Sequence, residues 1–353
     1  MSDATKARIA VLGASGYAGA ELVRLLLRHP RAEIILLTAD RRAGHEMRDV
    51  FPQFSAYRLP KLVAIESVDW RAPLDLAFCA LPHATTQAVI KDVLGKAPSV
   101  KVVDLSADFR LADPKAYARW YGHAHQATEL QQEAVYGLSE VHREAIRRAR
   151  LIANPGCYPT CAQLALIPLL AANAIDPDEI VIDAKSGMTG AGRAAKEEML
   201  FAEVSEGMHA YGVGHHRHMA ELDQELSRAA GRAVTASFTP HLAPMNRGIL
   251  STIYVRGAGD RLAEHLHAIL AKSYASEPFV HVLPLGEMPQ TRHVRGSNLT
   301  AIGVAPDRKA GRAIIGSALD NLVKGAAGQA VQNMNLALGF PEEMGLEQVA
   351  LFP

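Results

Sequence analysis

The expected fold is decided by the stretch Arg8–Gly19, which reads RIAVLGASGYAG. An apolar run of strand length passes directly into three glycines spaced Gly-x-x-Gly-x-x-Gly, and the apolar-striped segment Glu21–Leu27 follows. Such glycines permit a tight turn and let the pyrophosphate of a dinucleotide approach the N–H groups at the positive end of a helix. The pattern predicts the first strand, loop and helix of a nucleotide-binding sheet, although an ordinary strand-to-helix turn can also carry such glycines.

The end of the second expected strand, Glu33–Leu37, should meet the adenosine ribose of a bound dinucleotide. There the sequence reads TADRR, residues 38–42. Asp40 favours NAD, whereas Arg41 and Arg42 favour the 2′-phosphate of NADP, so these residues leave both cofactors open and also suit a solvated charged loop. The candidate cofactor contacts of this region are Gly13, Ser15, Gly16, Tyr17, Gly19, Arg41 and Arg42.

Short apolar runs alternate with helical patterns through the first half of the chain. Beyond the first two strands, these runs lie at Leu74–Ala80, Val100–Leu105 and Leu151–Ala153. The alternation predicts a parallel, doubly wound sheet, that is, an α/β Rossmann domain.

The second half has longer β-rich runs separated by long connections, which favours an α+β domain with a mixed sheet. These runs lie at Glu179–Ala184, Ala233–Phe238, Ile249–Val255 and Leu299–Val304. After them, Lys309–Met334 carries apolar residues at helical spacing, which predicts a C-terminal helix that packs back on the first domain. The expected division is a first domain of residues 1–156 and 312–353 and a second domain of residues 157–311.

Charge and hydropathy argue against several classes of protein. The 37 Lys and Arg residues balance 37 Asp and Glu residues, which leaves no net field to attract nucleic acid. The longest apolar stretch, Leu164–Ile175, is interrupted by Pro168 and Asn173 and is shorter than the roughly 18 residues that suggest a membrane span. The first residues, MSDATKAR, lack the apolar core of a signal peptide, so we expect a cytoplasmic protein.

Cys157 is the candidate nucleophile. It lies in ANPGCYPT, residues 153–160, after a short strand and a Pro-Gly turn and just before the helical stretch Cys161–Leu170. The positive end of a helix dipole favours a thiolate, and the turn should expose the side chain. A buried, inert cysteine is the alternative, and it suits Cys79 and Cys161 better. The three cysteines have the spacing of neither a disulfide framework nor a zinc site.

The densest histidine cluster is GHHRHMAE, residues 214–221. Its spacing lacks the pairs typical of metal sites, so no metal is expected, and a Cys/His catalytic pair is favoured over a polar surface cluster. An irregular lead-in before a helix that starts near Met219 would let His216 and His218 enter one cleft. We expect His216 to be the general acid/base and His218 to contact substrate or phosphate.

Two stretches at strand ends are suited to anions. SADFR, residues 106–110, follows Val100–Leu105, and KSGMTGAGR, residues 185–193, follows Glu179–Ala184. Parallel α/β sheets bind ligands at the carboxyl ends of strands, and guanidinium groups bind phosphate or carboxylate bidentately. Arg110, Ser186 and Arg193 are therefore candidate substrate contacts, although each arginine taken alone also suits a surface ion pair.

Stretches running in order through nearly the whole chain resemble the N-acetyl-gamma-glutamyl-phosphate reductase family (type 1), within the superfamily of aspartate-semialdehyde and glyceraldehyde-3-phosphate dehydrogenases. They are Gly13–Gly19, Ala80–His83, Asp104–Arg110, Tyr136–Glu140, Asn154–Thr160, Lys185–Arg193, His216–His218, Gly296–Asn298 and Asp320–Gln329. One departure is Ser139, where the family's pattern has proline, in a turn without a catalytic role.

The resemblance implies an enzyme of arginine biosynthesis that reduces N-acetyl-gamma-glutamyl phosphate with NADPH through a thioester on Cys157. It implies that the first domain binds NADP(H) and that the second domain holds the small-molecule substrate and the contacts of a homotetramer. It further implies that Asn298, Gly325, Ala326 and Gln329 lie at the nicotinamide end of the cofactor.

Several alternatives remain open. Reductases of aspartyl phosphate and of N-acetyl-aminoadipyl phosphate are the nearest, and the latter substrate differs by one methylene, worth only about 1–3 kcal/mol in a pocket. A Cys-His acyl hydrolase would need no glycine loop, and a non-catalytic NADP-binding sensor would need no reactive Cys157.

Overall fold

The computed structural model describes residues 5–352 of the chain, which form two compact units. Unit 1 contains the described residues up to Pro155 together with Ala326–Glu347, and unit 2 contains Gly156–Gly325 together with the described residues from Gln348. Residues 1–4 and 353, which the expected domain ranges include, lie outside the described residues. Two of the crossings between units fall next to the predicted site residues Cys157 and Gly325.

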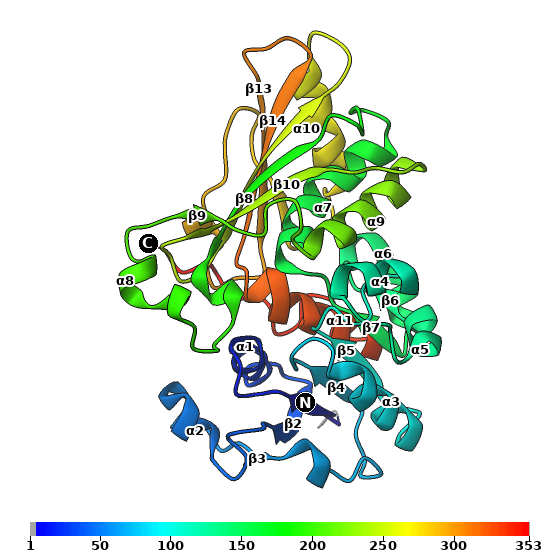
Figure 1. Ribbon diagram of the computed structural model, residues 1–353, viewed down its shortest axis with the longest axis vertical. Coiled ribbons are helices and arrows are strands. Elements are labelled where there is room, and N and C mark those ends of the chain that lie inside the picture. Colours follow the sequence, from blue (N-terminus) through cyan, green and yellow to red (C-terminus); the bar gives the residue numbers. More distant parts are fainter. Residues whose placement is uncertain (1–4, 353) are drawn as a thin grey trace. The chain divides into compact units, whose positions relative to one another are not determined.

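Unit 1 is a Rossmann domain with a sheet in the order β3-β2-β1-β4-β5-β7-β6, whose neighbouring strands are parallel, as expected (Figure 1). Its strands are β1 (Ala7–Leu12), β2 (Ala32–Thr38), β3 (Leu62–Val63), β4 (Leu76–Cys79), β5 (Lys101–Asp104), β6 (Val135–Tyr136) and β7 (Leu151–Ala153). Its helices are α1 (Tyr17–Leu26), α2 (Met47–Val50), α3 (Thr86–Lys96), α4 (Pro114–Tyr121), α5 (Thr128–Glu133), α6 (Ser139–Arg148) and α11 (Gly328–Leu338). The strand order reverses between β1 and β4, which makes their carboxyl ends the crevice at which such sheets bind ligands.

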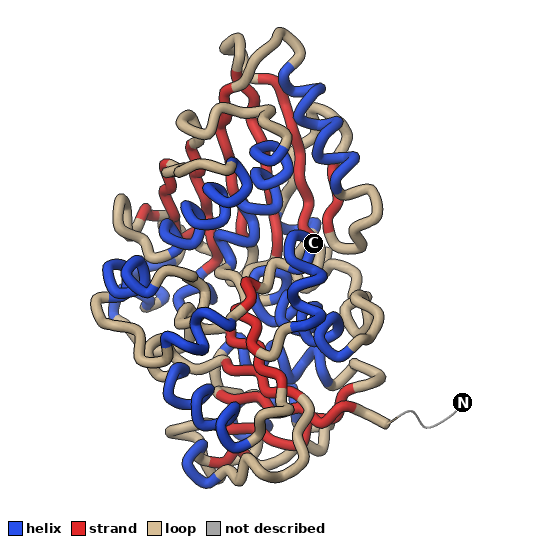
Figure 2. Tube along the Cα trace, turned by 90° about the vertical axis from the view of Figure 1, so that its right-hand side faces the viewer, coloured by secondary structure: helices blue, strands red, loops and turns tan. Residues whose placement is uncertain are grey.

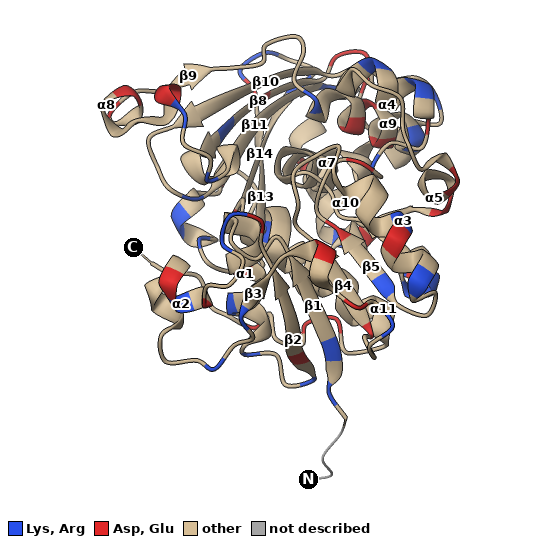
Figure 3. Ribbon diagram, turned by 60° about the horizontal axis from the view of Figure 1, so that its bottom comes forward, with Lys and Arg blue, Asp and Glu red and all other residues tan. Residues whose placement is uncertain are grey.

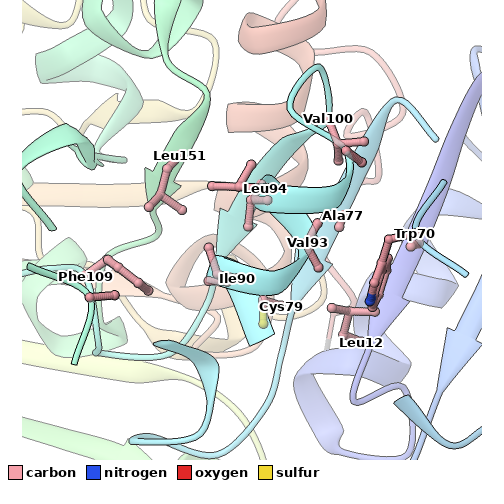
Figure 4. Close-up of a cluster of buried hydrophobic side chains, with 14 of the residues drawn as sticks. Leu12, Trp70, Ala77, Cys79, Ile90, Val93, Leu94, Val100, Phe109 and Leu151 are labelled. Carbon is pink, nitrogen blue, oxygen red and sulfur yellow. The ribbon is translucent and has the colours of Figure 1, made fainter. Parts of the chain in front are cut away.

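The core of unit 1 explains why its apolar runs form strands and helices. Ala77 and Cys79, two residues apart on β4, belong to one buried cluster with Ile90, Val93 and Leu94, whose spacing is that of one face of α3 (Figure 4). Cys79 is fully buried, as expected, and burial raises the pKa of its thiol well above the usual value. Cys79 is therefore a core residue.

Unit 2 contains a mixed sheet in the order β12-β13-β14-β11-β8-β10-β9, which confirms the expected α+β character. Its strands are β8 (Val181–Gly187), β9 (His209–Ala210), β10 (Ser237–Ala243), β11 (Ile249–Arg256), β12 (Val280–Val282), β13 (Thr300–Pro306) and β14 (Arg312–Leu319). Its helices are α7 (Cys157–Ala171), α8 (Phe201–Val204), α9 (His218–Ala230) and α10 (Leu262–Ser273). Figure 2 shows the strands of each unit as a sheet of their own with helices against it.

The expected helix Lys309–Met334 is wrong in its first half, because Arg312–Leu319 is strand β14 of unit 2. The segment that returns to unit 1 therefore begins at Ala326 instead of residue 312. β14 is a central strand between β13 and β11, and its residues from Ile315 onward are buried without alternation. A strand buried on both faces has consecutive apolar residues, which in this sequence coincide with helical spacing.

Helix α11 returns to unit 1 as expected, and an amide network binds it there. Asn333 Nδ2 donates to Gly137 O (2.8 Å) and to Asn154 Oδ1 (3.1 Å), and Asn154 Nδ2 donates to Ala326 O (3.1 Å). Ser139, the departure from the family's pattern, donates from Oγ to Asn333 Oδ1 (2.9 Å). The network therefore joins the two segments at which the chain leaves and re-enters unit 1.

Figure 3 shows Lys and Arg residues and Asp and Glu residues distributed along the ribbon. Among residues 5–352, no helix is both long enough and apolar enough to cross a membrane.

Candidate active site

The glycine loop of unit 1 joins β1 to α1. Gly13 has a φ of +81°, and a Cβ at this position would collide with the carbonyl oxygen of Ala80. A Cβ at Gly19 would collide with the carbonyl oxygen of Gly13. Thr38, the last residue of β2, fixes the loop, because its carbonyl oxygen accepts from Ala14 N (2.9 Å) and its Oγ1 accepts from Gly13 N (3.2 Å). The closest approaches in the loop are therefore made by backbone and leave no space for side chains.

The other predicted residues of this region surround the loop. Gly16 is the N-cap of α1, and Ser15 and Tyr17 beside it are half-buried. The turn after β2, residues 40–42, is exposed and holds the acidic candidate together with both arginines. The turn that holds Asp40, Arg41 and Arg42 thus begins two residues after Thr38, which contacts the glycine loop. Because the acidic residue and both arginines are exposed there, the structure leaves the choice between NAD and NADP open.

Cys157 is the first residue of α7 and is half-buried, whereas Cys161, one turn further on, is fully buried. Burial raises the pKa of the Cys161 thiol, which also donates to the carbonyl oxygen of Ser317 (3.2 Å). The helix starts four residues earlier than the expected Cys161, so the positive end of its dipole lies at Cys157 itself. The three cysteines therefore differ as expected, and only Cys157 combines partial exposure with a helix N-terminus.

Buried polar groups hold the turn before Cys157. Gly156 N donates to Glu221 Oε1 (2.7 Å), and Thr160 Oγ1 donates to Gly156 O (2.9 Å). Within unit 1, Arg110 Nε donates to Asn154 O (2.8 Å), and Nη2 of the same guanidinium donates to Leu105 O (2.9 Å). Arg110 is only 6% exposed, so this predicted anion ligand already binds the carboxyl ends of two strands.

The two predicted histidines lie together in unit 2. Their rings are 4.8 Å apart, and His216 also makes edge contacts with Tyr158 (5.9 Å) and Tyr211 (5.3 Å). His216 precedes α9 and His218 begins it, so the expected irregular lead-in is confirmed. The backbone N–H of His218 donates to His216 Nδ1 (3.2 Å), which places the ring hydrogen of neutral His216 on Nε2.

Burial, together with the smaller effects of the neighbouring Arg217 and His215, lowers the pKa of His216 to about 4. Near neutral pH this imidazole is therefore uncharged. A neutral imidazole whose Nδ1 accepts a hydrogen bond can donate one through Nε2–H.

Ser186 and Arg193 occupy different surroundings. Ser186 is the next-to-last residue of β8, is 1% exposed and hydrogen-bonds to Tyr158, whose pKa is raised, chiefly by burial. Tyr158 OH in turn donates to His241 O (3.0 Å). Arg193 is exposed in the segment that follows β8. The structure thus places Ser186 in the polar cluster of the histidines and Arg193 at the surface.

The residues carried over for the nicotinamide end differ in burial and contact. A Cβ on Gly325 would come within 2.8 Å of Cys157 Cβ, so this glycine lies directly against the candidate nucleophile. Asn298 is fully buried in unit 2, and Ala326 is half-buried. Gln329 is fully buried in unit 1, where Nε2 donates to Gly137 O (3.0 Å) and Oε1 has no hydrogen-bond partner within the described residues.

The sequence interpretation did not single out Glu221, Tyr158 or Tyr211. Glu221 follows His218 by three residues on α9, so the two side chains share a face of the helix. This spacing is the sequence signal that could have identified Glu221. Tyr158 follows Cys157 directly, but the partner that places it, Tyr211, is distant in sequence (Oη to Oη 3.3 Å). Within residues 5–352, no group of three or more His, Cys, Asp or Glu side chains is placed to hold a metal ion.

Family models match both halves of the chain. Residues 8–149 match the semialdehyde dehydrogenase NAD binding domain, and residues 157–321 match the semialdehyde dehydrogenase dimerisation domain. Among solved structures, aspartate semialdehyde dehydrogenase II from Vibrio cholerae covers 95% of this chain and 99% of its own with a TM-score of 0.72 and 19% identity. The Candida albicans enzyme, solved with NADP, covers 94% and 98% with a TM-score of 0.66 and 17% identity. These two structures share the fold.

Relatives at much higher identity carry one name. The N-acetyl-gamma-glutamyl-phosphate reductase of Afipia carboxidovorans is 72% identical over 349 residues, 99% of each chain. That of Rhodospirillum rubrum is 60% identical over 350 residues, again 99% of each chain. A probable chloroplastic enzyme of Arabidopsis thaliana is 55% identical over 98% of this chain and 85% of its own. With identity at this level along its whole length, the chain belongs to the N-acetyl-gamma-glutamyl-phosphate reductase family.

Proposed function

We propose that this protein reduces N-acetyl-gamma-glutamyl phosphate to N-acetylglutamate 5-semialdehyde and phosphate with NADPH, in arginine biosynthesis. The observation that carries the proposal is the half-buried thiol of Cys157 at the start of α7, in the same unit as the paired histidines, in a chain 72% identical to a reductase of that name. An acyl phosphate is already activated, so a thiolate can displace phosphate and form a thioester.

Unit 1 has the features that a dinucleotide requires. Side chains at Gly13 and Gly19 would fill the loop, and the N-terminus of α1 follows it directly, so a pyrophosphate fits against backbone N–H groups there. The buried Oε1 of Gln329 is an acceptor suited to a carboxamide. When bound, NADPH supplies the hydride that reduces the thioester.

Arg41 and Arg42 are the proposed contacts to the 2′-phosphate, supported by their exposure in the turn after β2. Replacing both with alanine should raise the KM for NADPH by about tenfold or more, because charge-assisted hydrogen bonds are lost, and change that for NADH little. Steady-state kinetics with the two cofactors measure this. Equal losses with both would mean that the arginines hold the structure of the turn.

Cys157 is the proposed nucleophile, and the macrodipole of α7 favours its thiolate. Its Sγ attacks the acyl carbon, the C–O bond to phosphate breaks, and a thioester forms. After reduction, the C–S bond of the thiohemiacetal breaks, the aldehyde leaves and the thiolate is restored. Asn298 and Gly325 are the proposed neighbours of the reacting carbonyl, and the contact of Gly325 with Cys157 supports this for the glycine.

The hydrogen bond between the histidines changes their proposed roles. His216 Nδ1 already accepts from His218 N, so proton uptake at Nδ1 would break that bond. We therefore propose that His216 donates from Nε2 to the carbonyl oxygen and that His218 moves the proton at the thiohemiacetal oxygen. This assignment reverses the order favoured by the sequence.

Phosphate recognition is proposed for Ser186 and Arg193, with Arg110 contributing through the turn that it anchors. Ser186 lies in the polar cluster around Tyr158, and Arg193 is exposed on the segment after β8. Two guanidinium nitrogens of Arg110 bind backbone carbonyls. An Arg110→Lys variant that loses turnover while its KM for substrate stays constant would fit anchoring, and a raised KM would fit direct phosphate binding.

A homotetramer is proposed in which the half-exposed face of the unit 2 sheet meets another copy. Val181 is 43% exposed, and Tyr254 and Ile314 stand beside it in register on neighbouring strands. The matched dimerisation domain supports this choice of face. Light scattering should give the mass of four chains, and Tyr254→Lys should lower that mass.

A cytoplasmic location is also proposed, because a free thiolate needs a reducing compartment.

The test of the function is phosphate-dependent oxidation of N-acetylglutamate 5-semialdehyde with NADP, run beside aspartate semialdehyde and the N-acetyl-aminoadipate analogue. We expect a kcat/KM for the acetylglutamate compound at least about tenfold above that for the longer analogue, the discrimination that one methylene allows. Equal activity on all three would overturn the substrate assignment.

A further inference from the structure

A buried carboxylate binds the turn that carries Cys157. Glu221 is 1% exposed, and its Oε1 accepts from the backbone N–H of Gly156 at 2.7 Å. Gly156 is the N-cap of α7, so the bonded N–H belongs to the residue directly before Cys157. The carbonyl oxygen of Glu221 accepts from Gln163 Nε2 (3.1 Å), which is a second contact between the same two helices. Glu221 therefore connects α9 to the turn of the nucleophile.

The position of Glu221 explains how a carboxylate is tolerated there. It lies in the first turn of α9 and contacts the first residue before α7, so the positive ends of two helix dipoles face one anion. Burying a carboxylate without such compensation costs several kcal/mol. The two helix N-termini therefore compensate the burial of the Glu221 side chain, and the hydrogen bond to Gly156 N satisfies Oε1.

We propose that Glu221 is a positioning residue that sets the Cys157 thiol in line with His218. His218 and Glu221 are three residues apart on α9 and share a face of the helix, so a bond from Glu221 to the Cys157 turn fixes the offset between thiol and imidazole. The inference rests on the proposed roles of Cys157 and His218. Misplacement by about 1 Å can cost about 10²-fold in rate, which makes such a bond worth keeping.

Glu225 offers a matched control on the same helix. Glu225 lies one turn beyond Glu221 and is also 1% exposed. Its carboxylate forms an ion pair with Arg228 (3.1 Å). Removing the Glu225 carboxylate deletes a buried ion pair on the same helix and leaves the hydrogen bond to the Cys157 turn in place. A loss of turnover shared by both positions would then reflect the stability of α9.

The test compares Glu221→Ala, Glu221→Gln and Glu225→Ala. Glu221→Ala should lower kcat by about 10²-fold with both KM values unchanged, because alignment and not binding is lost. The alkylation rate of Cys157 by iodoacetamide should stay within about threefold, since a small reagent needs no alignment with an imidazole. Glu221→Gln should recover most of kcat, because its amide oxygen can accept the same N–H bond. Glu225→Ala should keep kcat.

A second variant removes the same bond from the other side. Gly156 has a φ of −69°, which proline adopts, so Gly156→Pro deletes the N–H donor and leaves Glu221 in place. It should reproduce the loss in kcat, and the losses of Gly156→Pro and Glu221→Ala should not add in the double variant.

Three results would overturn the inference. The first is a Glu221→Ala variant with the kcat of the wild type, and the second is a Glu225→Ala variant that loses as much kcat as Glu221→Ala. The third is a folded Glu221→Ala variant in which the rate of Cys157 alkylation falls as much as kcat. If Glu221→Ala does not fold, wild-type kcat in Gly156→Pro decides against it. A wild-type enzyme that cannot reduce N-acetyl-gamma-glutamyl phosphate would instead refute the proposed function.

Discussion

Two turns of this molecule lead from a strand into a helix, and they are held in opposite ways. The turn from β1 to α1 depends on missing side chains, because Gly13 and Gly19 lie against backbone. The turn from β7 to α7 depends on long buried side chains, because Arg110 binds the carbonyl of Asn154 and Glu221 binds the N–H of Gly156. An open backbone suits a bound phosphate, whereas a clamped backbone suits a reactive side chain. The same supersecondary unit is thus proposed to serve phosphate binding in one case and covalent chemistry in the other.

The largest effect is expected from replacing the proposed nucleophile in the turn from β7 to α7. Cys157→Ser should lower kcat by about 10⁴-fold or more and leave NADPH binding intact, because a serine hydroxyl is a far weaker nucleophile than a thiolate at neutral pH. Turnover assays and a fluorescence titration of NADPH measure the two quantities. Cys79→Ser and Cys161→Ser are the controls, and both should keep turnover. Alkylation that labels either of them while sparing Cys157 would contradict the assignment.

The next effect concerns the histidines beside that turn. His218→Asn should lower kcat by about 10²–10⁴-fold and remove one limb of the pH profile, the usual consequence of losing a general acid/base. His216→Asn should lower kcat by about 10²-fold, as for one lost oxyanion donor, and keep both limbs. Profiles of kcat against pH distinguish the two. If only His216→Asn removes a limb, the sequence-based order of roles is restored.

A change in the first turn should affect the cofactor and spare the thiol. Gly19→Ala would press a Cβ against Gly13 O and should raise the Kd for NADPH about 10- to 100-fold, the equivalent of the 1–3 kcal/mol cost of overpacking. The rate of Cys157 alkylation should not change. Gly95→Ala in α3 is the matched control, because its Cβ meets nothing within 4 Å. Equal losses in both glycine variants would show a general effect on unit 1.

The smallest effect is on stability at low pH. The pKa of His216 is about 4, below the unfolded value of 6.5, so its contribution to stability is present above pH 6.5 and is lost as pH falls through 4. Asp104 has the opposite sign, because burial raises its pKa to about 7 and its contribution is lost as pH rises through that value. The wild-type curve alone therefore mixes the two.

His216→Asn separates them, because an asparagine side chain can accept the same hydrogen bond from His218 N and does not titrate. Between pH 6.5 and 4.5 the Tm of the wild type should fall about 2–4 °C further than that of the variant. Calorimetry at several pH values measures this. Parallel curves would mean that the pKa of His216 is the same in the folded and unfolded protein.

The sequence was sufficient where structure follows from local pattern. The strand Leu151–Ala153 and the glycine loop depend on residues next to one another, and the structure has both, whereas the helix expected from Cys161 begins four residues earlier, at Cys157. It failed at β14, because a central strand loses the alternation that identifies strands. Short edge strands such as β6 were also missed, since two residues carry no period.

The candidate site shows the same limit. Cys157 and the two histidines were proposed from their own neighbours in sequence, and their roles stay predictions. Glu221 was not, because the fact that matters is its bond to Gly156, 65 residues away. Arg110 was read as an anion ligand from its place after a strand, but the carbonyl that it binds at Asn154 depends on the packing of β5 beside β7. Residues that position others are defined by tertiary contacts and leave little trace in local sequence.

The amide network around Asn333 has a consequence for how the protein is made. Unit 1 is completed by α11, whose Asn333 binds Gly137 and Asn154, yet the ribosome must first synthesise Gly156–Gly325. At 5–20 residues per second this takes about 10–30 s. During that interval Gly137 and Asn154 lack their contacts with α11, while unit 2 is still being synthesised. Unit 1, whose parallel sheet appears first in the chain, is thus completed only after all of Gly156–Gly325 has been synthesised.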